Sequence, residues 1–421
     1  MQELIGLLGL LGVVAAITAA MGFRGRDQVV GIDLGTTFSV VALKSNDRVT
    51  VLPDYITGRQ LVPSMVTYLA NGSLLVGGPA RDVRGSLPLN TIFNAKRFIG
   101  RTLGEVSEDA ADHPFHVRGN ESSLVEGLVT DINQTAAGFW VPSDAGISGH
   151  RWISPIDVGA EVVRHLRKSV QAYLGHPISR AVICVPAKFS YRETKATQAA
   201  FEAAGIKVAR VLEEPTAAAV AYNLHKVSSP RHVLVYDIGG GTLDTSLLYS
   251  TGRSLSVLGV AGDDHLGGSD FDHRTHHLLE RKLRNATEGP TEPRPTQMCS
   301  SSGGLLALAE QAKIRLSSDL KTEVRCLKED GGTLVMTVTR EEFEEACQDL
   351  FDRSMSPVAQ VLQDQMMTPD VVDDVVLVGG ASRTPKLRQL LQEFFGPEKR
   401  LHTDIDPDIT IAYGAANILD Y

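Results

Sequence analysis

The sequence predicts an α/β protein made of two related lobes, and three observations support this fold class. Apolar runs typical of strands alternate with segments of helical periodicity, which is the pattern of α/β architecture. A strand–turn–strand unit with an Asp before a Gly/Thr turn occurs twice, 204 residues apart. The 421 residues, 43% hydrophobic and 22% charged, fit two or three compact globular units.

The expected elements follow from periodicity and turn signals. The first half contains strands at 28–33 and 38–43, a helix at 156–179, a strand at 181–185 and a helix at 191–204 that Gly205 ends. The second half contains strands at 232–237 and 245–249, a loop at 285–304, a helix at 341–361, a strand at 374–378 and a helix at 385–395.

An uncharged run from Leu4 to Phe23 precedes the first strand and is just long enough to span a bilayer. We interpret residues 1–23 as a signal peptide or signal anchor, and we expect membrane contact only through residues 4–23. Arg24 and Arg26 follow the run, which argues against simple secretion. Sequons add a little to a lumenal interpretation, the endoplasmic reticulum or microsome; they begin at Asn71, Asn120, Asn133 and Asn285.

Charge and cysteine usage exclude several classes of protein. The formal charge is −9 and no block of Lys and Arg occurs, so nucleic acid is not an expected partner. Four cysteines in 421 residues are too few for a disulfide scaffold, and because none forms a C-x-x-C motif, a zinc site or thioredoxin-type chemistry is not expected. We expect Cys184 and Cys347 to be small buried hydrophobes.

The two repeated turns have the composition of phosphate-binding loops. The first contains Asp33, Gly35, Thr36 and Thr37, and the second runs from Asp237 to Asp244 around three glycines. Glycine lets backbone N–H groups approach phosphate oxygens, and the carboxylate before each turn can hold Mg²⁺ through water. One such turn would fit an ordinary hairpin. Two copies favour phosphate binding, and neither is a Walker A loop.

These motifs resemble the three signatures of the 70 kDa heat-shock chaperones. The segments are Gly31–Ser39, Asp237–Asp244 and Val376–Arg383, and further matches lie at Asn90–Gly100, Glu214–Ala219, His265–Asp272 and Asp406–Ala416. The resemblance runs from about Val29 to Tyr421. It implies the actin-like ATPase fold, with two ribonuclease H-like lobes around a nucleotide cleft.

The resemblance also implies a division of the chain. Lobe I is expected at 28–225, with an outer subdomain at about 63–154, and lobe II at 226–421, with an outer subdomain at about 267–347. The chain is expected to lack a peptide-binding domain. Implied partners are nucleotide and, beyond it, nucleotide-exchange factors, J-domain co-chaperones or quality-control proteins.

The resemblance assigns a role to each residue of the expected site, with ATP or ADP and Mg²⁺ as cofactors. Asp33 and Asp237 would position the metal. The chemistry would depend on Lys96, Glu214, Asp237 and Thr242, with Lys96 placing the attacking water. The phosphate loops would contribute Gly35, Thr36, Thr37, Phe38, Gly239, Gly240 and Gly241. Adenosine would contact Glu310, Lys313, Ser317, Gly379, Gly380, Ser382, Arg383 and Asp408.

Three positions depart from the family pattern. Ile314 stands where the family usually has an Arg that stacks on adenine, so we expect adenine between the Arg383 plane and an apolar face. Phe38 replaces the common Tyr and loses only a hydroxyl. Thr194 replaces an Arg that couples the lobes to a peptide domain.

Three functions remain open from the sequence. The first is a slow Mg-dependent, peptide-independent ATPase of the chaperone family. The second is an ATP-gated scaffold with negligible turnover. The third is a small-molecule kinase, against which the chaperone-like motifs argue. The histidines at 273, 276 and 277 could bind a metal, but a solvated helix face is the favoured interpretation.

Overall fold

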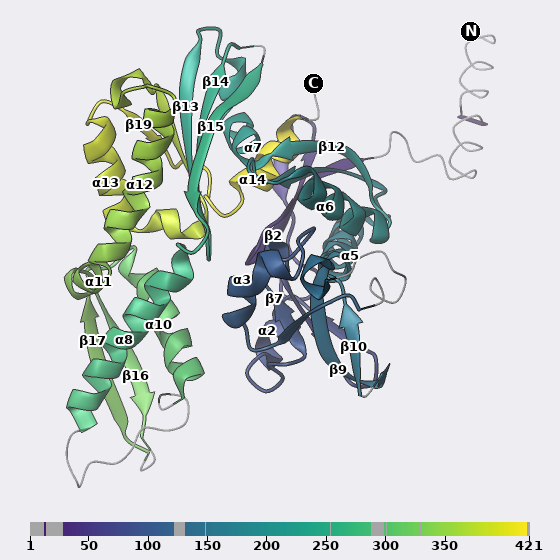
Figure 1. Cartoon of the computed structure of the whole chain (residues 1–421). Coiled ribbons are helices and arrows are strands. Elements are labelled where there is room, and N and C mark those ends of the chain that lie inside the picture. The colour runs from purple at the N-terminus through teal and green to yellow at the C-terminus, as the bar shows by residue number, and fades with distance from the viewer. Residues whose placement is uncertain are drawn as a thin grey trace.

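Two lobes lie side by side in the computed structural model (Figure 1). The structure describes residues 12–13, 28–121, 131–147, 149–252, 254–287, 299, 301–328 and 331–418. The expected signal segment therefore lies outside the described residues except for Gly12 and Val13, and so does most of the expected 285–304 loop. Within the described ranges, no helix combines the length and the apolar character that a bilayer crossing requires.

The centre of lobe I is a sheet in the order β12-β11-β1-β2-β3, with β4 paired to β2. β1 is antiparallel to β2 and parallel to β11, and β11 is parallel to β12. The strands are β1 (Val29–Leu34), β2 (Phe38–Ser45), β3 (Arg48–Val51), β4 (Val62–Pro63), β11 (Arg180–Val185) and β12 (Lys207–Glu213).

Lobe II repeats this topology in the order β15-β14-β13-β18-β19. β13 is antiparallel to β14 and parallel to β18, and β18 is parallel to β19. The strands are β13 (Arg231–Ile238), β14 (Leu243–Ser250), β15 (Leu255–Asp263), β18 (Asp374–Val378) and β19 (Arg400–His402). The two sheets share strand order and direction, so the repeat in the sequence corresponds to a repeated fold unit.

Helix boundaries follow local capping chemistry. Ser154 and Ser190 begin α5 (Pro155–Leu174) and α6 (Tyr191–Ala203) with reciprocal side-chain and backbone hydrogen bonds three residues apart. α5 ends before the expected position 179, because Gly175 adopts a left-handed φ of 76°. The expected helix at 341–361 is two helices, α11 (Arg340–Ala346) and α12 (Gln348–Asp364).

The remaining elements form the outer parts of the two lobes and their connections. In lobe I they are β5 (Met65–Tyr68), β6 (Leu74–Val76), α2 (Gly78–Val83), β7 (Thr91–Phe93), η1 (Ala95–Arg97), η2 (Gly104–Val106), α3 (Ser107–Ala111), β8 (His116–Gly119), η3 (Ile132–Gln134), β9 (Ala137–Ile147), β10 (His150–Ile153) and η4 (Leu224–Lys226). In lobe II they are α8 (Gly268–Thr287), α10 (Ser302–Leu316), β16 (Lys321–Leu327), β17 (Thr333–Thr339), η5 (Pro369–Val371), η6 (Gly380–Arg383) and α13 (Pro385–Phe395).

Two short helices join the lobes where these meet. α7 (Glu214–Ala221) follows β12 of lobe I but packs also against β13 of lobe II. α14 (Thr410–Asn417) follows lobe II in sequence but packs on β1 and β2 of lobe I. A Cβ at Gly414 would lie 1.8 Å from the Ala217 carbonyl oxygen, so only glycine permits this close crossing. The crossing couples the base of each lobe to the other.

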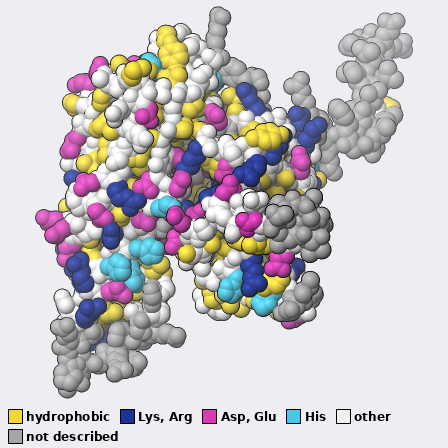
Figure 2. All heavy atoms as spheres, viewed as in Figure 1, with side chains coloured by type: hydrophobic (Ala, Val, Ile, Leu, Met, Phe, Trp, Pro, Cys, Tyr) yellow, Lys and Arg dark blue, Asp and Glu magenta, His cyan; other side chains and the backbone are white. Residues whose placement is uncertain are grey.

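Cysteine pairing and surface charge complete the description. Cys184 and Cys347 are free and buried, as expected. Cys299 and Cys326 form a disulfide, which the sequence analysis did not predict. On the face shown in Figure 2, Lys and Arg are scattered among Asp and Glu.

Candidate active site

The two repeated turns meet between the lobes. The turn at Gly35–Thr37 connects β1 to β2, and the turn at Gly239–Thr242 connects β13 to β14. A Cβ at Gly240 would lie 2.2 Å from Thr37 Oγ1, so a side chain at Gly240 would separate the turns. The structure therefore places two glycine-rich backbones, from opposite lobes, within contact distance of each other.

Hydrogen bonds from a neighbouring serine fix the shape of the first turn. The Ser64 N–H donates to the Thr37 carbonyl at 2.9 Å, and the Ser64 hydroxyl lies 2.8 Å from the Gly35 carbonyl. Ser39 Oγ lies 2.8 Å from Ser64 Oγ. The protein thus satisfies two carbonyls of the turn itself. Phe38 begins β2 directly after this turn and pairs with Pro63.

Lys96 and Glu214 form a buried ion pair at the base of the site. Lys96 Nζ donates to Glu214 Oε1 at 2.6 Å, and the two side chains are 10% and 11% exposed. Lys96 lies in η1 of lobe I, and Glu214 begins α7 just before Pro215. Burial opposes the charge of Lys96, but Glu214 and Asp33 outweigh it and raise the lysine pKa. Lys96 therefore remains a cation beside the acidic residues.

Three further carboxylates cluster around this pair. Burial is the main cause that raises the pKa of Asp33 to about 7, with Glu214 adding to it and Lys96 opposing it. Burial, then Glu214 and Asp244, raise the pKa of Asp237 well above its ordinary value. Burial also raises the pKa of Asp244. Burial thus disfavours the ionised forms of these carboxyls unless a further cation offsets their charge.

A divalent cation fits this cluster of buried acids. Asp33 Oδ1 is buried and accepts no hydrogen bond from the described residues. Hard cations such as Mg²⁺ prefer carboxylate and water oxygens, and they favour the ionised form of such groups. Asp33 and Asp237 stand at equivalent places in the two lobes, so they are the residues that would hold the ion.

One cation of the site was not predicted from the sequence. Lys188, in the loop after β11, places Nζ 2.9 Å from Asp244 Oδ1. Lys188 lines a pocket together with Glu214, Asp237 and Asp244. Its Pro-Ala-Lys-Phe context has no glycine or repeated acid that would have identified it as a site residue.

A third glycine turn, Gly379–Gly380 directly after β18, lies beside Asp237. Gly379 has a φ of 78°, and a Cβ there would lie 2.9 Å from Asp237 Oδ1. A Cβ at Gly380 would lie 2.6 Å from Asp408 Oδ1. The Ser382 hydroxyl donates to the Gly379 carbonyl at 2.7 Å. Backbone without side chains therefore adjoins both acids, as close ligand approach requires.

Arg383 is held by two acids next to this turn. Its guanidinium lies 3.1 Å from Asp408 Oδ2 and also pairs with Asp406. Burial raises the pKa of Asp408, whereas Arg383 opposes that shift. The planar Arg383 side chain is therefore fixed at one edge of the turn.

Helix α10 carries the other expected adenosine contacts. Lys313 pairs with Asp272 at 2.7 Å and donates to the Gly268 carbonyl at 2.8 Å. A Cβ at Gly268 would lie 3.2 Å from Lys313 Nζ and 3.6 Å from Ala381 Cβ, so Gly268 stands between α10 and the third turn. Ser317 donates to the Lys313 carbonyl, Glu310 is exposed and Ile314 is 60% exposed.

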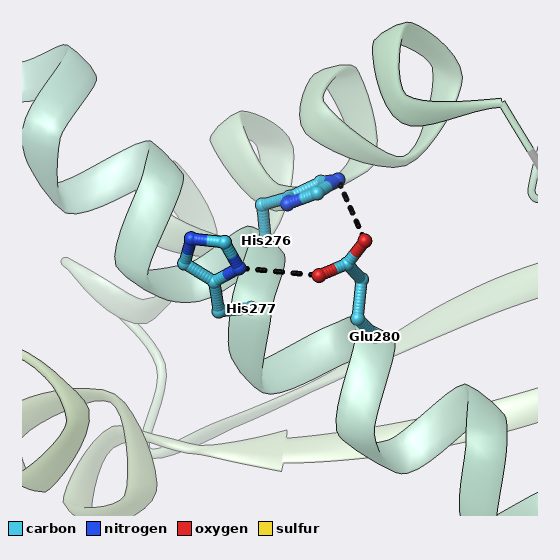
Figure 3. A group of neighbouring side chains, drawn as sticks. All are labelled: His276, His277 and Glu280. Atoms are coloured by element: carbon cyan, nitrogen blue, oxygen red, sulfur yellow. Dashed lines mark hydrogen bonds and ion pairs between the residues drawn. The ribbon is translucent and has the colours of Figure 1, made fainter.

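Figure 3 shows the histidine cluster, whose members all lie on α8. His277 Nδ1 is 3.1 Å from Glu280 Oε2, and His276 Nε2 is 3.8 Å from Glu280 Oε1. The expectation of a solvated face is wrong for His276, which is buried, and correct for His273 and His277, which are exposed. Their ligand atoms lie within 4.8 Å of one another, but all three side chains come from one helix and two are partly or fully exposed.

A family comparison covers nearly the whole described chain. The family model described as "Hsp70 protein" matches residues 29–420. The match includes both sheets, the three glycine turns and the Lys96–Glu214 pair.

Proposed function

The chain belongs to the Hsp70 family and has its actin-like ATPase fold, and from this premise we propose that it is a slow Mg-dependent ATPase acting in protein processing or quality control in the endoplasmic reticulum. Family membership makes it a chaperone-type ATPase that binds ATP and ADP. The Mg²⁺ requirement, the slow turnover and the lumenal role are the parts that we propose.

One observation carries the proposal. Two glycine turns from opposite lobes touch at Gly240 and Thr37, above a buried pair of Lys96 and Glu214 and beside an unpartnered Asp33 oxygen. Phosphoryl transfer needs positioned phosphates, a metal and compensating positive charge more than it needs covalent chemistry. Mg²⁺ would supply charge compensation between Asp33 and Asp237, while Lys96 orients water and Glu214 holds Lys96.

The slow turnover follows from the same geometry. Glu214 Oε1 already accepts a hydrogen bond from Lys96 Nζ at 2.6 Å. It is therefore not a free strong base for the attacking water. Catalysis would therefore depend on in-line positioning by Lys96, Thr242 and the loops. We also propose that hydrolysis by this chain is independent of peptide, because the described residues assigned to the site belong only to the two lobes.

Two observations support the lumenal location. Disulfides are rare in reducing compartments, and Cys299 pairs with Cys326. The sequon residues Asn71, Asn133 and Asn285 are exposed. The apolar run at 4–23 would direct the chain there, in the arrangement that resembles the microsomal stress-70 ATPase core of the same family. Endoglycosidase treatment of the protein from microsomes should increase its gel mobility; unmodified protein that external protease digests would contradict the location.

Calorimetry tests the nucleotide site. The wild-type full chain should bind Mg-ADP, and Gly240→Val should lose binding because its side chain would lie where Thr37 lies. Gly85→Ala is a matched control, since a Cβ there meets nothing within 4 Å. Equal affinity of the wild type and Gly240→Val would contradict the site.

The ATP-gated scaffold remains the second candidate function. Burial raises the pKa values of Asp33, Asp237 and Asp244, so a bound cation would favour their ionised forms, and such binding requires no turnover. Nucleotide binding without measurable hydrolysis in a single turnover would favour this alternative.

A further inference from the structure

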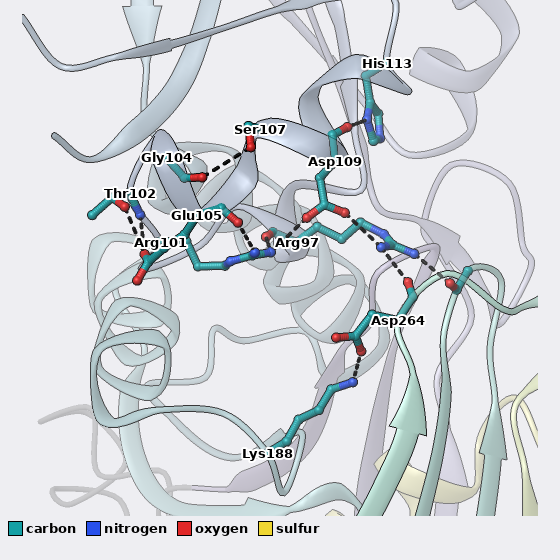
Figure 4. A network of polar contacts seen from close by, with 11 residues as sticks. Arg97, Arg101, Thr102, Gly104, Glu105, Ser107, Asp109, His113, Lys188 and Asp264 are labelled. Carbon is teal, nitrogen blue, oxygen red and sulfur yellow. Dashed lines mark hydrogen bonds and ion pairs between the residues drawn. The ribbon is translucent and has the colours of Figure 1, made fainter. Parts of the chain in front are cut away.

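Two cationic side chains of lobe I, Arg97 and Lys188, both bind Asp264 in a loop of lobe II (Figure 4). Arg97 follows Lys96 in η1 and donates to the Asp264 main-chain oxygen at 2.8 Å and to the Gly241 carbonyl at 2.6 Å. Asp109 orients Arg97 from behind at 3.0 Å. The residue next to the expected water-placing lysine is therefore bonded directly to the second phosphate turn.

Lys188, in the loop after β11, binds the same lobe II loop through the Asp264 side chain. Its Nζ pairs with the Asp264 carboxylate and lies 2.9 Å from Asp244 Oδ1. Burial alone would lower the pKa of Lys188, but Asp244 and Asp264 raise it, so the side chain stays charged. Asp264 is thus held through its main chain by Arg97 and through its side chain by Lys188.

The start of α8, which follows the loop that carries Asp264, is hydrogen-bonded to the phosphate turn. The Gly268 N–H donates to the Gly239 carbonyl at 2.9 Å, and the Ser269 N–H donates to the Gly240 carbonyl at 2.8 Å. A Cβ at Gly267 would lie 2.4 Å from the Gly241 nitrogen. A displacement of Asp264 would therefore be transmitted to the backbone that faces the phosphates.

We propose that Arg97, Lys188 and Asp264 form a lobe clasp that keeps the cleft closed over a bound nucleoside diphosphate or triphosphate and sets the rate of its release. This inference rests on the proposed nucleotide site. Arg97 and Lys188 act as positioning residues, since they hold the lobe II turn in place. Opening the lobes far enough to release nucleotide requires both cations to leave Asp264 and Gly241.

The ion pairs of Lys188 differ from ordinary surface ion pairs because they join the two lobes. Exposed ion pairs stabilise proteins little. Lys188, however, is 34% exposed and is shared by two carboxylates of the opposite lobe, of which Asp244 is 27% and Asp264 is 62% exposed. Arg192 and Glu105 provide a contrast, because they form a more exposed pair at 2.7 Å with both partners in lobe I. Breaking that pair leaves the contacts between lobes unchanged.

Stopped-flow release of a fluorescent ADP analogue from the full chain tests the clasp. Lys188→Met and Asp264→Asn should each release nucleotide about 2- to 5-fold faster, the upper part of the range expected for losing one solvent-accessible ion pair. The double variant should be no faster than the quicker single variant, because both changes remove the same contact. Lys188→Arg should restore slow release, and Arg192→Met should match the wild type.

Two further readouts separate the possible outcomes. Spin labels at Tyr173→Cys and Met366→Cys, which are exposed sites on opposite lobes, should give a broader distance distribution when Lys188→Met is added. Calorimetry on the wild type establishes binding itself. Wild-type binding of Mg-ADP with unchanged release in Lys188→Met and Asp264→Asn would overturn the clasp alone, whereas absence of wild-type binding would overturn the proposed function.

Discussion

Lys96→Met should be the most damaging single change at the site, and its cost can be worked from the structure. The variant removes the only group at hydrogen-bond distance from Glu214 Oε1 among the contacts described, at 2.6 Å, and both side chains are about nine-tenths buried. Removing one partner of a buried ion pair typically costs about 3–5 kcal/mol of folding free energy. Turnover should fall by about 10²–10³, the scale for losing one electrostatic transition-state contact.

The loss of stability in this variant should depend on pH. Lys96 lowers the pKa of Asp33, so without it the clustered carboxyls bind protons more readily in the folded chain. A proton can replace the missing lysine charge below neutral pH but not above it. Urea unfolding should therefore show a larger difference between Lys96→Met and wild type at pH 8 than at pH 6.

A double variant provides the control. Lys96→Met with Glu214→Gln removes the unpaired charge as well, so it should recover most of the lost stability but none of the turnover. Lys96→Met with turnover within about threefold of the wild type would refute the assigned role, given the much larger loss expected for a transition-state contact. A double variant no more stable than the single one would refute the buried-pair energetics.

Three other outcomes are expected. Burial raises the folded pKa of Asp33 from 3.8 to about 7, so between these pH values the metal-free folded protein binds a proton that the unfolded chain has lost. The stability of the folded protein should therefore fall as pH rises across that interval. Thermal melts of Asp33→Asn should show a smaller fall with pH, and a pH dependence identical to that of the wild type would contradict the raised pKa. Ile314→Arg should tighten ATP binding by up to about tenfold through a cation–π contact with adenine, as calorimetry would measure; unchanged or weaker binding would mean that adenine is held differently. Cys299→Ala with Cys326→Ala opens a loop of 27 residues and should cost about 3–4 kcal/mol in denaturant unfolding, while no change would mean that the pair does not constrain the unfolded chain.

The repeated parts of the molecule could be predicted from the sequence. Asp33 and Asp237 each end an apolar run before a Gly/Thr turn, and this pattern depends only on neighbours in the chain. The strands around both turns and the parallel strands at 181–185 and 374–378 are confirmed, and so is the helix at 385–395. Local composition was sufficient to predict these strands because the apolar residues of each strand lie next to one another in the sequence and are buried.

Features that depend on distant contacts were not predictable. α14 packs on the lobe that precedes it by hundreds of residues, which no local pattern in Thr410–Asn417 indicates. Lys188 reaches Asp244 and Asp264 only because the two lobes meet. Cys299 and Cys326 are neither adjacent nor in a motif, so their pairing follows from the tertiary structure. His276 is buried on α8 while its neighbour His277 is exposed, and which face of α8 is covered depends on α10 and α11, which pack against that helix.

Single-turnover hydrolysis of radiolabelled ATP by the full chain tests the central claim most directly. Labelled phosphate should appear with Mg²⁺, should not appear when the metal is chelated, and should form at the same rate with or without a hydrophobic heptapeptide. Binding of ATP with no phosphate release in the presence of Mg²⁺, or release that needs no metal, would contradict the account of Lys96, Glu214 and the paired aspartates.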